Sequence, residues 1–277
     1  MRTITIASTL ILCLTLSQSF AQSAPTPSTT AVRLIATTKT ATFEKELNKA
    51  AKEGFRLTRL AKADYGSGVS GLVTQDNVAP RYEYKVLSTT RLSTLQKEVE
   101  QAAAEGYEVR GLTTEGNATT FTTKEITAVM ERPVGTTERR FTYKLVTAKK
   151  LQEDLDNTVA EGFVPVELFV TQRSDLGMMV SLSGSSLLLN ILFCRAANST
   201  AAPDSEYRIV WRADHAKMTE ELNQLAREGF QLHLVATYPV VLMARLKQTA
   251  SPRYEYTVLA DSRKNPLPKQ MTEVGAQ

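Results

Sequence analysis

The stretch that decides the fold is QAAAEGYEVRGL, at residues 101–112. It has the pattern of a helix that ends at a glycine and passes into a strand. The same pattern occurs in KAAKEGFRLTRL (49–60), NTVAEGFVPVEL (157–168) and QLAREGFQLHLV (224–235). A Glu-Gly-aromatic triplet that recurs in this way indicates either a structural joint or a repeated binding site. Its members are the glutamates Glu53, Glu105, Glu161 and Glu228 and the glycines Gly54, Gly106, Gly162 and Gly229.

Apolar residues precede each glycine at helical spacing. In the second copy, Leu95, Val99 and Ala103 stand eleven, seven and three residues before Gly106. Because a spacing of four places side chains on one helical face, each copy is predicted to contain an amphipathic helix of about 12 residues. Thr42 and Thr94 directly precede the first apolar position of two copies, and we expect them to be N-caps.

The glycine is predicted to end the helix. Glycine adopts the left-handed conformation required after a helix without the steric cost of a Cβ atom. The aromatic residue behind it would begin the next strand and fold back onto the helix. We therefore interpret the triplet as a structural joint, and a ligand site is the alternative.

Alternating segments before and after each helix predict three strands per copy. Each copy is then a β-α-β-β unit, in which a crossover joins two parallel strands and the last two strands form a hairpin. The fold class is α+β, and we expect the four units to associate as two pairs whose sheets join edge to edge, with helices on one face. The first strands are expected at 32–37, 82–88, 141–147 and 207–213, and the third strands at 70–75, 126–132, 188–195 and 240–246.

A fifth beginning occurs near the C-terminus. SPRYEYTVLA (251–260) nearly repeats APRYEYKVLS (79–88), but no helix or glycine joint follows it. An extra strand at 253–260 is expected to cover the edge of another unit's sheet, or alternatively to pair with a second chain as a homo-oligomer.

These patterns divide the chain into seven segments. The expected boundaries are a signal peptide at 1–21, a flexible linker at 22–31, units at 32–80, 81–135, 140–198 and 206–249, and an extra strand and tail at 250–277.

The first residues have the composition of a secretory signal. Arg2 precedes an apolar run from about Ile4 to Leu16, and small residues lead to a cleavage site expected after Ala21. We predict a secreted or periplasmic protein with no membrane span after signal removal; an uncleaved anchor and lipidation at Cys13 are the alternatives. Removing the signal leaves Cys194 as the only cysteine, so no intramolecular disulfide can form.

The second copy, YEYKVL…LQKEVEQAAAEGYEV…VMERP, resembles a small bacterial domain of unknown function. Members of that family have a YEYKV start and a GWEL-like joint, where this chain has Phe or Tyr in place of Trp. The resemblance implies a β-α-β-β fold in four degenerate tandem copies. It implies no catalytic residue, because the family pattern carries none.

The glutamate before each glycine requires a separate explanation. A negative charge at a helix C-terminus opposes the helix dipole. We predict that the glutamate pairs with a basic residue of the first strand (Arg33, Lys85, Lys144 or Arg208) or accepts a backbone N–H. The arginines that end the third strands, Arg132, Arg195 and Arg245, are alternative partners, and a solvated glutamate inherited with each copy is a further one.

Few residues suggest catalysis. The only histidines are His215 and His233, and no metal-ligand spacing, nucleophile elbow or phosphate loop is present. Asp204 and Asp214 near His215 suggest a general-base arrangement, but a turn before a helix is the simpler interpretation. We predict no enzyme, cofactor or bound metal. The net charge of +4 without a Lys/Arg block gives no indication of nucleic-acid binding.

The links between the second and third strands differ most among the copies. Variation at one end of a repeated scaffold is where binding specificity commonly lies. The predicted partner-binding rim contains Phe121, Met178 and Met179. We expect an exported, non-enzymatic binding or scaffold module whose protein or envelope partner is unknown. An enzyme with a site between units is the alternative, and inter-unit clefts lined by polar groups with shifted pKa values would favour it.

Overall fold

The computed structural model describes residues 31–62, 68–76, 81–117, 122–172, 187–199, 201–236, 240–247 and 254–258. The chain divides into two compact units, Met1–Ala31 and Val32–Gln277, and Ala31 alone is described in the first. The predicted signal peptide at 1–21 therefore lies outside the described residues. Within them, no helix is both long enough and apolar enough to cross a membrane.

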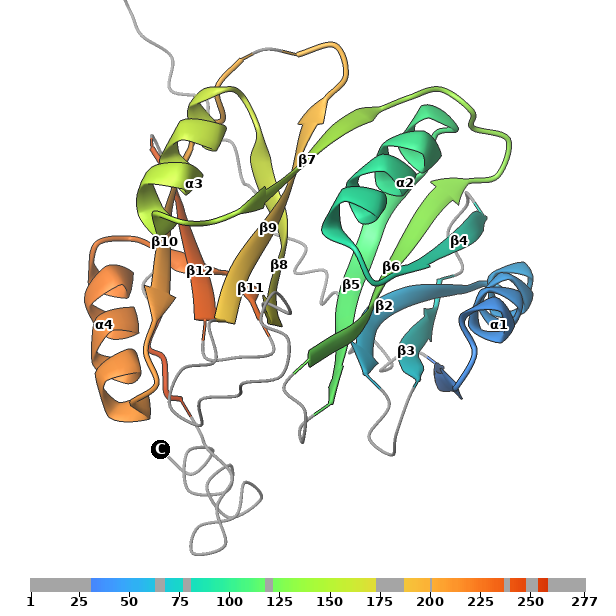
Figure 1. Ribbon diagram of the computed structural model, residues 1–277, viewed down its shortest axis with the longest axis horizontal. Coiled ribbons are helices and arrows are strands. Elements are labelled where there is room, and N and C mark those ends of the chain that lie inside the picture. Colours follow the sequence, from blue (N-terminus) through green and yellow to red (C-terminus); the bar gives the residue numbers. More distant parts are fainter. Residues whose placement is uncertain are drawn as a thin grey trace, which may run out of the picture. The chain divides into compact units, whose positions relative to one another are not determined.

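The described residues form a mixed α+β structure of four helices and twelve strands, arranged in four three-stranded antiparallel sheets (Figure 1). The order strand, helix, strand, strand occurs in each of four consecutive segments, which we call modules 1 to 4. Module 1 contains β1 (Val32–Thr37), α1 (Thr40–Lys52), β2 (Phe55–Lys62) and β3 (Val69–Gln75), and module 2 contains β4 (Tyr82–Thr89), α2 (Leu92–Ala104), β5 (Glu108–Asn117) and β6 (Thr122–Pro133). Module 3 contains β7 (Phe141–Thr147), α3 (Leu151–Ala160), β8 (Val164–Gln172) and β9 (Leu187–Ala196), and module 4 contains β10 (Ser205–Trp211), α4 (His215–Arg227), β11 (Gln231–Val235) and β12 (Val240–Leu246).

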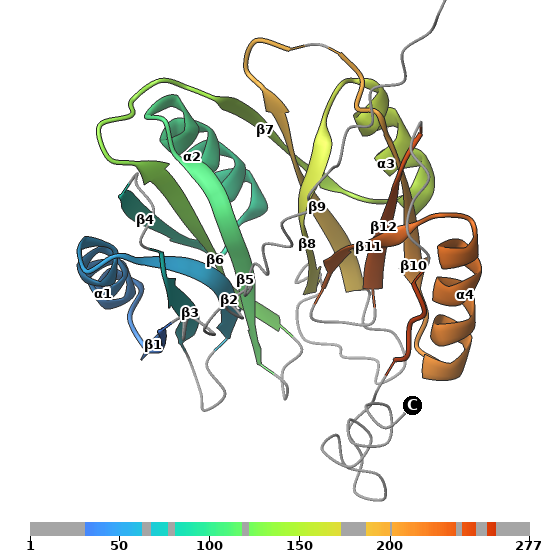
Figure 2. The same cartoon turned by 180° about the vertical axis from the view of Figure 1, so that it is seen from behind.

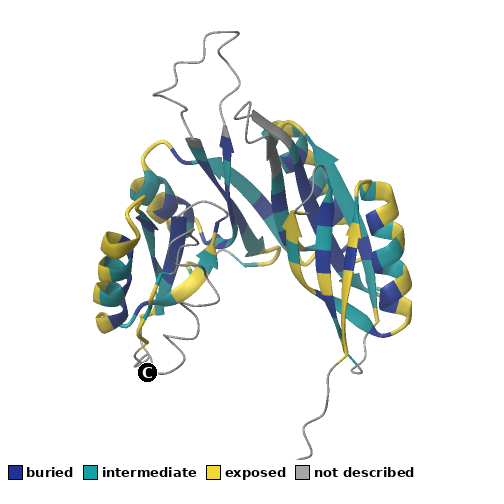
Figure 3. Ribbon diagram, turned by 90° about the horizontal axis from the view of Figure 1, so that it is seen from below, coloured by how far each residue is buried: buried dark blue, intermediate teal, exposed yellow. Residues whose placement is uncertain are grey.

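The helices bury the face that the four-residue spacing predicts. Leu95, Val99 and Ala103 are each at most 1% exposed. Figure 3 shows the same alternation in the helices, with buried residues on the side of the strands and exposed residues on the other side. The predicted N-caps are wrong, because α1 begins at Thr40 after Lys39 and α2 begins at Leu92 after Arg91.

The sheet order differs from the predicted one. In module 1 the order is β1-β3-β2, and both β1 and β2 pair antiparallel with β3. The hairpin of the second and third strands is thus confirmed, but the strands on either side of the helix do not pair with each other. They run in the same direction with the third strand between them. Figure 2 shows the helix α2 on one face of its own sheet.

The expected joining of sheets edge to edge is also wrong. Each of the four sheets holds only its own three strands. The outer edge of a first strand instead faces the helix of the preceding module, whose side chains bond its free amides. A second module therefore stabilises the first by packing and by edge capping rather than by extending its sheet.

Each second strand carries an irregularity at the same position, and β5 has another between Glu115 and Gly116. The pairing with the third strand shifts at Thr58, Arg110, Val166 and His233, four residues after the module's joint glycine. Such an extra residue bends a strand and turns its own side chain out of the regular alternation. Two of these residues contact the preceding module. Arg110 Nε donates to the Leu57 carbonyl at 2.9 Å, and His233 Nε2 lies 3.0 Å from the Pro165 carbonyl.

The predicted extra strand is not a strand within residues 254–258. This segment, Tyr254–Val258, belongs to none of the described sheets. It packs on module 4, where Tyr256 and Val258 join the core formed by residues such as Met218 and Leu222. Among the described residues, no strand pairs with this segment.

Candidate functional site

The Glu-Gly-aromatic joint stands at the end of each of the four described helices. The glycines Gly54, Gly106, Gly162 and Gly229 have φ values of 93°, 90°, 90° and 89°. These angles fall in the region that residues with a Cβ atom rarely adopt, and each glycine follows the last turn of a helix.

The glutamate at this joint forms an ion pair in modules 1, 2 and 3. Glu53 bonds Arg33 at 2.7 Å, Glu105 bonds Lys85 at 2.7 Å, and Glu161 bonds Lys144 at 2.6 Å. The predicted pairing with the first strand is thus present in modules 1, 2 and 3. These pairs are partly exposed, so each contributes at most about 1 kcal/mol to stability.

The third-strand arginines bind the same joint from another side. Arg132 Nη1 donates to the Glu105 carbonyl at 2.8 Å, and its guanidinium lies 4.4 Å from the centre of the Tyr107 ring. Arg195 with Glu161 and Arg245 with Glu228 repeat this bond. The arginine thereby satisfies a helix-terminal carbonyl and covers the aromatic face. The joint glutamate pairs with a basic residue in modules 1 to 3, and an arginine bonds its carbonyl in modules 2 to 4. These contacts indicate that the joint has a structural role.

The joints between modules form a second recurring feature. Tyr84 begins the interface of module 2 with module 1: its hydroxyl accepts the Leu57 N–H at 2.9 Å, and Asn48 bonds both its N–H and its carbonyl. One turn earlier on α1, Glu44 accepts the Val86 N–H at 2.7 Å.

Equivalent contacts hold the later modules. Tyr143 is bonded by Gln96 and Glu100 of α2, and its hydroxyl accepts the Val109 N–H at 2.9 Å. Gln152 of α3 bonds the Tyr207 carbonyl and the Ile209 N–H. The tyrosines Tyr84, Tyr143 and Tyr207 are 3%, 5% and 4% exposed, and each belongs to the core of the preceding module.

A residue of the next third strand completes each of these cores. Val129, Leu192 and Leu242 stand opposite Val86, Leu145 and Ile209 in their sheets, and each of the three is 0% exposed. Val129 lies in the core of module 1, Leu192 in that of module 2, and Leu242 in that of module 3. A closed joint therefore needs both a tyrosine from a first strand and an aliphatic residue from a third strand.

The first of these joints also holds a buried carboxylate. Glu131 of β6 is 6% exposed and bonds Arg56 of β2 at 2.7 Å and the Tyr84 hydroxyl at 2.7 Å. Arg110 lies 3.8 Å away as a second cation. Burial and the neighbouring Glu131 charge hold the pKa of Tyr84 well above its usual value. The hydroxyl is therefore a fixed hydrogen-bond donor rather than an acid.

Module 4 has a joint of this kind that is only half filled. Tyr256 repeats the role of Tyr84: Asn223 bonds its N–H and carbonyl, and its hydroxyl accepts the Leu232 N–H at 2.9 Å. Among the described residues no third strand accompanies the segment Tyr254–Val258, and an apolar cavity of about 400 Å³ lies beside Tyr256 and Val258. Leu232 is 47% exposed there, whereas Leu57 at the equivalent position of module 1 is 1% exposed.

A polar groove of about 240 Å³ lies along the second strands. It is lined by β2, β5 and β8, with Val235 of β11, so all four modules contribute to it. The strands approach closely at Gly111, where an added Cβ atom would lie 3.1 Å from Leu60 Cβ. The charged and hydroxyl-bearing residues that line the groove are Thr58, Arg59, Lys62, Arg110, Thr113, Thr114 and Glu167.

Glu167 is the titratable group of this groove with an altered acidity. Burial raises the pKa of its carboxyl to about 7, against a smaller lowering by the Leu112 N–H and the Arg59 charge. The group is therefore divided between its protonated and ionised forms near neutral pH. Thr113, 7% exposed, also lines the groove, and within the described residues its hydroxyl oxygen has no hydrogen-bond partner.

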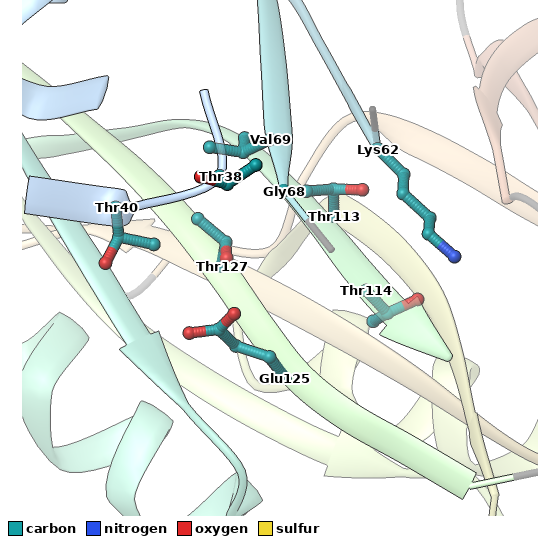
Figure 4. A pocket seen from close by; sticks show the side chains of 9 residues that line it. All are labelled: Thr38, Thr40, Lys62, Gly68, Val69, Thr113, Thr114, Glu125 and Thr127. Carbon is teal, nitrogen blue, oxygen red and sulfur yellow. The ribbon is translucent and has the colours of Figure 1, made fainter. Parts of the chain in front are cut away.

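Thr113 and Thr114 also border a smaller cavity, which Thr38, Glu125 and Thr127 help to enclose (Figure 4). Its volume of about 10 Å³ is about the space of one water molecule. In Figure 4 the hydroxyl oxygens of Thr113 and Thr114 lie on the side of the strand toward which Lys62 extends. The small cavity is too confined for an organic ligand, and the groove is the larger polar site.

The remaining candidate residues have structural surroundings. Asp214 caps α4 by accepting the Ala216 and Lys217 N–H groups, and these bonds lower the pKa of its carboxyl. His233 bonds the Pro165 carbonyl and packs against Tyr207, with ring centres 5.5 Å apart. Burial raises the pKa of the Cys194 thiol to about 11, which makes it a poor nucleophile.

The predicted rim cannot be placed, because Phe121, Met178 and Met179 lie outside the described residues. No group of three or more His, Cys, Asp or Glu side chains suited to a metal ion occurs in the described parts of the chain. Sequence reasoning missed the polar groove, whose residues come from separate modules and share no motif.

No family model, curated protein or solved structure matches this chain. The resemblance to a small bacterial domain therefore stays a prediction.

Proposed function

We propose that this chain is an exported, non-catalytic binding module built from four tandem copies of one β-α-β-β domain. The signal-like residues 1–21 support the export, and the identical element order of the four modules supports the common origin. The polar groove of the second strands is the binding site. The observation that carries this proposal is the Thr113 hydroxyl, 7% exposed and without a partner among the described residues, beside the Arg59, Lys62 and Arg110 cations of the same groove.

The chemistry of the groove favours a small organic anion. Guanidinium and ammonium groups recognise carboxylate and phosphate oxygens, and a buried hydroxyl without a partner loses about 1–3 kcal/mol that a ligand oxygen restores. Glu167 adds a donor when it is protonated, which its pKa of about 7 allows at neutral pH. A carboxylate- or phosphate-bearing small molecule is the ligand class that uses all these groups.

A second candidate function is general acid–base catalysis by Glu167, because a carboxyl with a pKa of about 7 suits proton transfer near neutral pH. Binding is the better supported of the two. The described residues that line the groove include one carboxyl group and neither histidine nor cysteine. Enzymes that hydrolyse glycosides with carboxyl groups commonly use two of them. Covalent mechanisms need a nucleophilic side chain.

Titration calorimetry with inorganic phosphate, succinate and neutral glycerol tests the proposal. We expect the two anions to bind and glycerol not to bind. Arg59→Ala is expected to weaken anion binding about tenfold, since a charge-assisted hydrogen bond contributes about 1.5–3 kcal/mol. Arg91→Ala, which removes an exposed arginine outside the groove, is the matched control and should leave binding unchanged.

The pH dependence separates the two candidates. Anion affinity should fall as pH rises through about 7, because ionised Glu167 repels the ligand, and Glu167→Gln should remove this dependence. Failure of every anion to bind, or binding that Arg59→Ala leaves intact, would contradict the proposal. Turnover of a bound anion that Glu167→Gln abolishes would instead support catalysis.

A further inference from the structure

The two ends of the module array carry matching halves of one joint. The half on module 1 consists of first- and third-strand positions that other modules bury against a preceding helix. Val32 and Leu34 occupy the positions of Tyr84 and Val86, and Leu72 stands opposite Leu34 as Val129 stands opposite Val86.

These module 1 residues are exposed. Val32 is 58%, Leu34 is 67% and Leu72 is 37% exposed, whereas Tyr84 and Val129 are 3% and 0% exposed. We call these three residues the donor face. Aliphatic side chains in the positions that form every closed joint, left in solvent, constitute an interaction surface with a defined geometry.

The half on module 4 is the acceptor face, formed by α4 and β11. Its lining residues Met218, Leu222 and Leu232 are the equivalents of Phe43, Leu47 and Leu57, which are each at most 1% exposed in the closed joint. Tyr256 and Val258 fill part of the acceptor face, but nothing in the described chain fills the position of Val129. The apolar cavity of about 400 Å³ lies at this position.

We propose that two copies of this chain associate head to tail, with the donor face of one copy docked on the acceptor face of the other. The donor strand β1 takes the place that Tyr254–Val258 occupies within a single copy, and Leu72 of β3 fills the cavity. The interface continues the geometry of the three joints inside each chain, which is why a second copy is the fitting occupant.

The segment Tyr254–Val258 is then a competitor built into the chain. The Tyr256 hydroxyl of this segment accepts the Leu232 N–H. The donor face has Val32 at the same position, and valine has no hydroxyl to accept that bond. The segment is part of the same chain and makes a hydrogen bond that Val32 cannot make, so it occupies the acceptor face. Association of two copies therefore requires the release of this segment. The apparent affinity of two copies equals the intrinsic affinity multiplied by the fraction of open acceptor faces.

Head-to-tail contacts are heterologous, because the two surfaces differ. Such contacts generate rings or open chains of copies rather than symmetric dimers. The inference does not depend on the polar groove or on its ligand.

Sedimentation velocity on the full chain tests it. Tyr256→Ala opens the acceptor face and should strengthen self-association about tenfold or more, through a larger open fraction. Adding Leu34→Glu to this variant should return it to monomer, because Leu34 would take the apolar position of Val258 on the acceptor face, where burying a charge is costly. Val134→Glu, at a residue 54% exposed and outside both faces, is the matched control and should leave the association unchanged.

A mixing experiment tests the direction of the contact. The double variant Tyr256→Ala, Leu34→Glu has an open acceptor and a blocked donor, and the natural chain has a closed acceptor and an intact donor. Their mixture should form a one-to-one complex and nothing larger. An excess of a peptide of residues 251–260 should dissociate this complex by competing for the acceptor face.

Two results would overturn the proposal. One is a folded Tyr256→Ala chain that stays monomeric at every concentration; Val258→Asp, which expels the segment by charge, provides the second opening variant if Tyr256→Ala does not fold. The other is association that survives Leu34→Glu or that the peptide leaves intact.

Discussion

The joint between modules 1 and 2 and the end of module 4 share one set of contacts but differ in burial. In both, a tyrosine hydroxyl accepts an N–H of the second strand at 2.9 Å, and an asparagine of the helix bonds the tyrosine backbone. Yet Leu57 is 1% exposed in the first and Leu232 is 47% exposed in the second. The difference is the third strand, which brings Val129 to the first joint; among the described residues, no third strand does so at the last.

The comparison shows that hydrogen bonds position the next module and that burial stabilises it. A hydrogen bond within the protein replaces bonds to water in the unfolded chain, so each contributes only about 0.5–1.5 kcal/mol to stability. Burying an aliphatic side chain contributes about 1.5–3 kcal/mol. A module with a filled joint is thus expected to be rigid, and the covering of α4 by Tyr254–Val258 is expected to open first.

The largest expected effect is at the buried ion pair of the closed joint. Arg56→Ala leaves the Glu131 carboxylate buried without its main partner, and we expect it to reduce the free energy of unfolding by about 3 kcal/mol. Urea denaturation measures this. Arg33→Ala breaks a pair of the same 2.7 Å length between exposed groups and should cost less than about 1 kcal/mol. Equal losses would show that joint burial does not set the energetics.

The second effect depends on pH. Burial in the polar groove desolvates Glu167, whose pKa is about 7 in the folded chain against about 4.3 in an unfolded one. The folded state therefore holds a proton that the unfolded state has lost, so stability falls as pH rises from about 4.5 to about 7. Glu167→Gln should stabilise the chain by on the order of 2 kcal/mol at pH 8 and by almost nothing at pH 4, a figure reduced for partial exposure.

Thermal unfolding of the two proteins at both pH values checks this prediction. If Glu167→Gln changed the stability by the same amount at pH 4 and at pH 8, the raised pKa of Glu167 would be contradicted.

The third effect compares the two tyrosines directly. Tyr84→Phe leaves the Leu57 N–H without its hydroxyl partner and removes one hydrogen bond from the buried Glu131, which should cost about 1–2 kcal/mol. Tyr256→Phe removes one bond to an exposed strand and should cost less than about 0.5 kcal/mol, because water replaces the hydroxyl. Chemical denaturation of both variants distinguishes the joints, and a cost at Tyr256 equal to that at Tyr84 would remove the distinction.

The smallest effect concerns the polar groove. Thr113→Val replaces a hydroxyl that is 7% exposed and unpartnered among the described residues, so we expect it to stabilise the ligand-free chain by up to about 1 kcal/mol. It should also weaken anion binding, measured by calorimetry. Destabilisation would indicate that the hydroxyl has a structural partner.

Much of the fold follows from local patterns in the sequence. The four-residue spacing of Leu95, Val99 and Ala103 predicts a helix and its buried face, and Gly106 predicts where the helix ends. The pairing of Glu105 with Lys85 follows from the unfavourable charge at a helix end. Each of these inferences uses residues within one module.

The sheet order and the sites depend on contacts between distant residues. The local sequence does not show that β3 lies between β1 and β2. A helix can connect two parallel strands whether they are adjacent in the sheet or separated by another strand. Thr42 reads as an N-cap, yet α1 begins earlier because the helix extends beyond its first buried residue. Glu167 looks like an ordinary strand glutamate, and its altered pKa arises from burial among the second strands of neighbouring modules.

Native-state hydrogen exchange of two amides distinguishes the filled joint of module 1 from the half-filled joint of module 4. The Leu57 and Leu232 N–H groups occupy equivalent positions and bond equivalent tyrosine hydroxyls, Tyr84 in a filled joint and Tyr256 in a half-filled one. We predict that Leu57 exchanges only through large-scale unfolding, whereas Leu232 exchanges at least about tenfold faster through release of Tyr254–Val258. Equal protection of the two amides would contradict the account, because the last joint would then be as closed as the first.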